Sequence, residues 1–267
     1  MNKLLIIKYI ILIITIIFFV SCEDILKLEV VGDGNIITDS LRWRNNFNIN
    51  EIELSENFQL EIYHSEKNRL YIETDSNIIT YIKTDFSKNK LTVRRQSDHI
   101  LKPSKHIILR LYIDNLNFID IWNKGKIYCD TLKTTDLKIN IYGKSTFKSD
   151  YIYAENLLFK TEDGANVEFN GEFIYIDFKQ KGSGESYLKG NVEILKMTQE
   201  GSGKIEALEL TATGANIYLR HSGLIYCNVS NYLSVDIKGS GRVYYLGNPQ
   251  FDDDDITIEG DGKVERY

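Results

Sequence analysis

The feature that most constrains this chain is a pattern that recurs eight times between Ile119 and Val264, about every twenty residues. In each copy an apolar stretch leads into a three-residue turn whose third residue is small, and a second stretch follows. These small residues are Gly125, Ser145, Ala165, Gly184, Gly203, Gly223, Gly241 and Gly262. Successive ones lie 20, 20, 19, 19, 20, 18 and 21 residues apart. So regular a period predicts a stack of similar units, each contacting mainly its neighbours.

The repeated segments have the periodicity of β-strands. Apolar residues alternate with polar ones, as at Leu137, Ile139 and Ile141, which is the period of a strand and excludes helical repeats. The leucine and asparagine ladder of leucine-rich repeats is absent. The sequence therefore predicts an all-β fold, a parallel β-helix or β-solenoid with coils of about twenty residues. Coils would stack ~4.8 Å apart, with equivalent side chains in ladders.

The small turn residue is expected to mark a corner of each coil. Glycine permits positive φ and brings the backbone close to neighbouring coils, and Ser145 and Ala165 indicate that small size also matters there. The Gly-Ser-Gly triplets that begin at Gly182, Gly201 and Gly239 are followed by strand patterns. A phosphate-binding loop would instead lead into a helix, so we interpret the triplets as turns.

The N-terminus has the pattern of an export signal. A short basic segment precedes an apolar run at residues 10–20, and Ser21 and Cys22 follow it. The run is too short to span a bilayer comfortably. A small residue before a cysteine resembles the lipobox of bacterial lipoproteins, which implies acylation of Cys22 after removal of residues 1–21. An ordinary signal peptide and a retained anchor are the alternatives.

The net charge and the cysteine positions argue against two features, a nucleic-acid partner and a disulfide. Removing residues 1–21, which hold two lysines and no acids, changes the net charge from −6 to −8. An acidic surface argues against nucleic acid as a partner. Cys129 and Cys227 share one register five coils apart, ~24 Å at ~4.8 Å per coil, which is too far for a disulfide. We predict two separate buried thiols.

The chain is expected to have four parts. These are a lipoprotein signal peptide at residues 1–21, a tether at 22–33, an irregular N-terminal β part of the solenoid at 34–117, and the regular eight-repeat solenoid at 118–267. The irregular part shows clear strand patterns without the period, and a separate subdomain remains an alternative for it. Four acidic residues at 252–255 are interpreted as a solvated charge run rather than a calcium site.

Several segments resemble a known family. Residues 34–37, residues 52–62 and the closing Gly-Ser-Gly-Arg-Val-Tyr-Tyr-Leu-Gly-Asn-Pro at residues 239–249 are similar to the head GIN domain. This is a family of auto-transporter adhesin-like proteins common among Bacteroidetes lipoproteins. The resemblance covers nearly all of the chain after residue 21. It implies a right-handed parallel β-helix and supplies no catalytic residues.

The function expected from these observations is that of a non-enzymatic lipoprotein of the cell envelope, with its lipid anchor in the outer membrane. It would be adhesin-like or bind extracellular glycans, through exposed tyrosines that stack on sugar rings. A scaffold role with an envelope protein as partner is the alternative. A polysaccharide-degrading enzyme is disfavoured because the acids near turns, Asp163, Glu185 and Glu200, form no repeated column. The histidines, His64, His99, His106 and His221, lack metal-ligand spacing, and no metal or cofactor is predicted.

Overall fold

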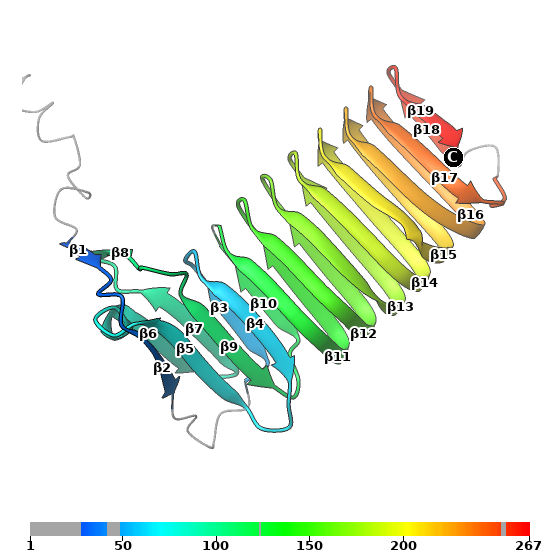
Figure 1. Ribbon diagram of the computed structural model, residues 1–267. Helices are drawn as coiled ribbons and strands as arrows, with labels where there is room; N and C mark the ends of the chain where they lie inside the picture. The colour runs from blue at the N-terminus through cyan, green and yellow to red at the C-terminus, as the bar shows by residue number, and fades with distance from the viewer. Residues whose placement is uncertain (1–27, 42–48, 123, 252–254) are drawn as a thin grey trace, which may run out of the picture.

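The computed structural model is an elongated stack of strands, described for residues 28–41, 49–122, 124–251 and 255–267 (Figure 1). Six long strands, each of 16 to 18 residues, bend around the core and form most of one coil each. They are β11 (Lys126–Ile141), β12 (Thr146–Thr161), β13 (Asn166–Lys181), β14 (Glu185–Gly201), β15 (Lys204–His221) and β16 (Leu224–Gly239). Shorter strands continue the stack at its C-terminal end: β17 (Arg242–Gly247), β18 (Ile256–Glu259) and β19 (Lys263–Arg266). The predicted β-solenoid is confirmed.

Neighbouring coils pair in parallel with the register that the repeat predicts. One ladder passes through β10 (Phe118–Ile121) and continues from there through the coils that follow in the chain. Its members are Ile119, Ile139, Phe159, Phe178, Met197, Ile217, Val235 and Ile256. Residues one period apart therefore lie directly over each other.

Apolar ladders fill the interior of the coils. The buried residues form one cluster that runs from Ile49 to Val243. Its widest side chains stack in the middle of the solenoid, where the Phe159 ring lies 5.1 Å from that of Phe147 and 5.3 Å from that of Phe178 between centroids. Apolar residues in a ladder are thus covered by the coils above and below them, except at the C-terminal end, where Ile256 is 39% exposed.

The corners differ from the expectation in one respect. Positive φ occurs at the first turn residue, and the described examples are Gly143, Asp163, Gly182, Gly201, His221, Gly239 and Gly260. None of the eight small third residues has positive φ, so the expectation that these glycines supply it is wrong. Their role is close approach. A Cβ added at Gly184 would lie 2.0 Å from the carbonyl oxygen of Ala165 in the coil below.

A polar column inside the corners was not anticipated from the sequence. Gln180 and Gln199 are 1% and 0% exposed and point into the space that the glycine corners leave open. The Gln180 Nε2 atom donates to the carbonyl oxygen of Gly184 at 2.7 Å, and its Oε1 atom accepts from the Ser186 hydroxyl. The buried Gln180 amide thus finds hydrogen-bond partners inside the corner, whereas the Gln199 Oε1 atom has none among the described residues.

The N-terminal part joins the same stack without following sequence order. Its strands are β1 (Leu28–Val31), β2 (Ile36–Leu41), β3 (Glu51–Leu54), β4 (Gln59–His64), β5 (Arg69–Asp75), β6 (Ile82–Ser87), β7 (Lys90–Arg95), β8 (His99–Lys102) and β9 (Ile108–Ile113). One 3₁₀ turn (Ile79–Tyr81) precedes β6. Strands β3 and β4 pair in parallel beneath β10 and β11, and β7 and β9 pair beneath them in turn. Strands β2, β5 and β6 add antiparallel pairs.

Part of the segment expected to be a tether belongs to this region. Residues Leu28–Val31 form β1, which pairs in parallel with β8 in a separate two-stranded sheet. The buried carboxylate of Asp75 contacts the turn that follows β1. It accepts hydrogen bonds from the backbone N–H of Gly34 at 2.8 Å and from the Ser104 hydroxyl at 2.6 Å. Burial raises the pKa of Asp75, but these hydrogen bonds outweigh it, so the pKa lies below its usual value.

Cys129 and Cys227 are free and buried, as predicted. Burial raises the pKa of the Cys129 thiol strongly and that of the Cys227 thiol to about 12. Both therefore remain protonated at neutral pH and are poor nucleophiles.

Candidate functional site

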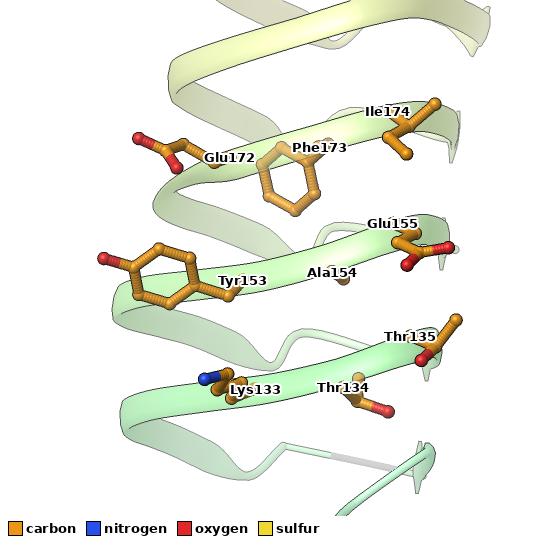
Figure 2. Close-up of a pocket in the computed structure, with 9 residues that line it drawn as sticks. All are labelled: Lys133, Thr134, Thr135, Tyr153, Ala154, Glu155, Glu172, Phe173 and Ile174. Carbon is orange, nitrogen blue, oxygen red and sulfur yellow. The ribbon is translucent and has the colours of Figure 1, made fainter.

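A shallow groove of about 510 Å³ lies across β11, β12 and β13 (Figure 2). Three consecutive residues from each strand line it: Lys133, Thr134, Thr135, Tyr153, Ala154, Glu155, Glu172, Phe173 and Ile174. The coil register places Lys133, Tyr153 and Glu172 in one column. The groove is therefore a grid of side chains set by the repeat.

The hollow lies over Ala154, the middle of the three lining residues on the middle strand, β12. Ala154 lies between Thr134 and Phe173 in neighbouring coils, and its single methyl group leaves room above the strand. Ala154 and Phe173 are 6% and 7% exposed and form an apolar floor. Figure 2 shows the longer side chains of Tyr153 and Glu155 on opposite sides of this floor.

The rim of the groove carries an aromatic ring and unpaired charges. The Tyr153 side chain is 43% exposed and that of Ile174 is 46% exposed. Within the part of the chain that the structure describes, Lys133 and Glu155 have no ion-pair partner. Their donor and acceptor atoms are available to a ligand.

A second tyrosine, Tyr151, contacts two of the residues that line the groove, Tyr153 and Glu172. The Tyr151 ring lies 4.5 Å from the Tyr153 ring between centroids. Desolvation and a hydrogen bond to Glu172 raise the pKa of Tyr151 to about 12. Tyr151 therefore stays protonated at neutral pH, donates to the Glu172 carboxylate and supports the exposed ring of Tyr153.

This arrangement suits a flat, hydroxyl-rich ligand. An exposed aromatic face packs against the apolar face of a sugar ring, while carboxylates and an ammonium group bond its hydroxyls. With one lysine and two glutamates, the groove carries a formal charge of −1. Neutral sugars fit this charge better than polyuronates.

Other exposed aromatic rings in the described coils already have partners from the protein. The Lys204 Nζ atom lies 5.7 Å from the centroid of the Tyr187 ring and 5.1 Å from that of Tyr226. Trp122 is 45% exposed, but its ring stacks on Tyr142 at 3.9 Å. The Tyr153 ring also has a neighbouring ring, that of Tyr151, and what distinguishes Tyr153 is its place on the rim of the groove.

The acids near turns do not assemble into a site. Asp163 is a first turn residue, Glu185 accepts from the Tyr187 hydroxyl at 2.9 Å, and Glu200 lies 3.5 Å from the Lys181 ammonium group. Among the described residues no cluster of histidines, cysteines and acids has the arrangement of a metal site.

The histidines are equally dispersed. His99 lies 2.7 Å from the Asp98 carboxylate, His221 occupies a turn, His106 lines a pocket near the N-terminal part, and His64 ends β4. Cys22 and the acids at 252–254 lie outside the described residues. No helix in the described part of the chain is long and apolar enough to cross a membrane.

The groove residues were not singled out from the sequence. The period alone puts Lys133, Tyr153 and Glu172 in one column, and Ala154 is a small residue among larger ones at its register. Those two signals together would have indicated a hollow beside an exposed tyrosine.

Comparisons with known proteins give a family and several similar folds. The family model described as "Putative auto-transporter adhesin, head GIN domain" matches residues 46–249. No curated protein matches.

Among solved structures, a "putative adhesin" from Parabacteroides merdae is 21% identical, with a TM-score of 0.82 over 90% of this chain and 99% of that one. A "putative lipid binding protein" from Parabacteroides distasonis is 20% identical, with a TM-score of 0.80 over 90% and 99% of the two chains. A "putative adhesin" from Bacteroides fragilis is 20% identical, with a TM-score of 0.65 over 89% and 100%. At these identities the likeness is one of fold.

Proposed function

Because the chain belongs to the family described as "Putative auto-transporter adhesin, head GIN domain", we propose that it is a non-enzymatic, adhesin-like protein of the cell envelope. The groove over β11, β12 and β13 binds a neutral glycan. The observation that carries this proposal is the exposed Tyr153 ring beside an apolar floor and unpaired polar groups. The rigid stack of coils holds these side chains in fixed positions, which reduces the entropy lost on binding.

Anchoring through Cys22 is part of the proposal. The N-terminal pattern supports an acylated cysteine at the start of the mature chain, in an outer-membrane lipoprotein. Several acyl chains are needed for a stable anchor, because a single chain binds only marginally. We expect palmitate supplied to cells to label the native protein and Cys22→Ser to abolish the label. Equal labelling of both proteins would contradict lipidation at this residue.

Glycan binding is tested with the chain lacking residues 1–21 and carrying Cys22→Ser, applied to a glycan array. Specific binding is expected, and Tyr153→Ala should weaken it at least ~10-fold, or ~1.4 kcal/mol, because the ring supplies the stacking face. Tyr187→Ala is the matched control, since Tyr187 is 39% exposed but lies outside the groove. Its affinity should be unchanged.

Two results would contradict the glycan proposal. One is an array without specific binding, and the other is an equal loss of affinity in Tyr153→Ala and Tyr187→Ala. A scaffold role is the second candidate function. It is favoured if the array is blank while an envelope protein copurifies in defined stoichiometry with the native chain.

A further inference from the structure

The last coil of the stack ends with an open edge (Figure 1). This coil consists of β18 and β19, which the corner at residues 260–262 joins. Strand β18 pairs with β16, and β19 pairs with β17. Among the strands that the structure describes, none pairs with the other edge of β18 or of β19.

The apolar ladders of the solenoid reach this edge without a cover. Ile256 and Ile258 continue ladders whose members in β16 are 1% and 0% exposed, yet they are themselves 39% and 40% exposed. Val264 continues a third ladder and is only partly buried. Solenoids need a terminal repeat with a polar outer face to remain soluble as single chains. The coil of β18 and β19 instead has apolar residues that a further coil would bury.

The backbone of β19 has groups available for pairing. In a parallel ladder, successive residues point their N–H and C=O groups alternately toward the two neighbouring strands. The N–H groups of Lys263 and Tyr267 donate to the coil below at 3.1 and 2.8 Å. The backbone groups of Val264 and Arg266 therefore point away from the stack.

The same alternation applies to β18. The carbonyl oxygen of Asp255 accepts from the Val235 N–H group in the coil below at 2.7 Å, so the backbone groups of Ile256 and Ile258 point away from the stack. A row of outward N–H and C=O groups on an edge strand is a template for another strand. The last coil thus offers both apolar side chains and backbone groups.

We propose that a second copy of this chain covers the open coil, with the β18 and β19 strands of the two copies stacked end to end. A two-fold axis through the corner, at Asp261, brings β18 of one copy antiparallel to β19 of the other. Ile258 then pairs with Val264, and Ile256 pairs with Arg266. These are the residues whose backbone groups point outward, so each pair exchanges two hydrogen bonds.

The charged side chains fit the same register. Glu259 of one copy lies opposite Lys263 of the other, and this pair occurs twice in the dimer. Lys263 has no ion-pair partner among the described residues and is the register partner of the like-charged Arg242. Glu259 lies 3.0 Å from Lys238 in the coil below. The dimer therefore extends an alternation of charge from Lys238 through Glu259 to Lys263, and opposite charges across strands are stabilising.

Two residues oppose this association. Arg266 follows Val264 on the inner face of the coil and sets a charge opposite Ile256. The two copies of Asp261 meet at the axis and repel each other. One coil also buries less than the ~1,600 Å² of a standard interface, so we expect a dimer that dissociates on dilution.

The two ends of the stack differ, which gives the dimer a direction. Figure 1 shows β1 and β8 at one end and β18 and β19 at the other. Near the first end, Leu70 and Ile72 of the antiparallel strand β5 are 1% and 2% exposed. The N-terminal parts of the two copies therefore lie at opposite ends of the dimer. Copies anchored at Cys22 would join opposing membrane surfaces, a consequence that rests on the proposed anchoring.

Sedimentation velocity of the chain lacking residues 1–21 and carrying Cys22→Ser tests the dimer without lipid or glycan. A monomer should convert to a dimer between micromolar and millimolar concentration. Ile258→Lys should weaken the dimer at least ~10-fold, because it removes the apolar partner of Val264 at both symmetric contacts. Ile194→Lys is the matched control, since Ile194 is 48% exposed but lies in β14. Its dimer affinity should be unchanged.

A charge exchange tests the register. Glu259→Lys sets like charges against each other at both contacts, and so does Lys263→Glu. Each change should weaken the dimer several-fold, and the two changes combined should restore it. Asp261→Asn gives an independent readout that requires no loss of affinity, because removing the repulsion at the axis should strengthen the dimer. Small-angle X-ray scattering should give a maximum dimension close to twice that of the monomer.

The proposal is overturned if the chain stays monomeric at millimolar concentration, or if the dimer is no longer than the monomer. Equal losses in Ile258→Lys and Ile194→Lys would also overturn it. The same holds if the combined exchange is no better than either single change, or if Asp261→Asn fails to strengthen the dimer. Lipidation and glycan binding are measured separately, so their failure is distinguishable from the failure of this proposal.

Discussion

Replacing Gly184 with alanine should destabilise the protein by about 3 kcal/mol, at the upper end of the cost of overpacking. The added Cβ would lie 2.0 Å from the carbonyl oxygen of Ala165. That atom belongs to the backbone of the coil below, so relief requires neighbouring coils to separate. The clash does not depend on φ at Gly184, because its backbone is not left-handed.

Gly214→Ala is the matched control, since a Cβ there would have no neighbour closer than 3.9 Å and φ is not positive. It should be neutral or stabilise by ~0.4–1 kcal/mol through the unfolded chain. Urea unfolding followed by circular dichroism measures both variants. If Gly184→Ala is no less stable than Gly214→Ala, close approach is not what keeps the corner residue small.

The fold of the regular coils was predictable because the repeat places equivalent residues of successive coils next to each other. A period of about twenty residues fixes the register, and the register places Ile139, Phe159 and Phe178 in one ladder. The buried thiols of Cys129 and Cys227 follow from the same register. No comparable signal exists at the N-terminal end, where the antiparallel pairing of β2 with β5 joins segments without a common period.

Side-chain chemistry within the coils was harder to predict. Glutamine is a polar residue that is usually exposed. Gln180 and Gln199 are nevertheless buried, because the glycine corners leave space for their side chains in the interior. Asp163 and His221 adopt positive φ at turns where most other coils have glycine, and both residue types are enriched there among non-glycine residues. The groove at Ala154 becomes visible only when three coils are aligned.

The central claim is that residues one period apart lie over each other in adjacent coils, and a pair of engineered cysteines tests it most directly. Lys148 and Glu168 are register partners on β12 and β13, with Lys148 Nζ and Glu168 Oε2 3.4 Å apart. Adjacent strands lie ~4.8 Å apart, within the Cα separation of a disulfide. Lys148→Cys with Glu168→Cys should therefore oxidise to a disulfide.

The control pair is Lys148→Cys with Asn166→Cys, because Asn166 is the register partner of Thr146. Its diagonal separation of ~8 Å, two residues along one strand and one strand across, exceeds the limit for bridging. Intact mass spectrometry after mild oxidation and thiol alkylation counts the free thiols in each variant. The account predicts a complete disulfide in the first variant and two alkylated engineered thiols in the second, and equal or reversed crosslinking would contradict it.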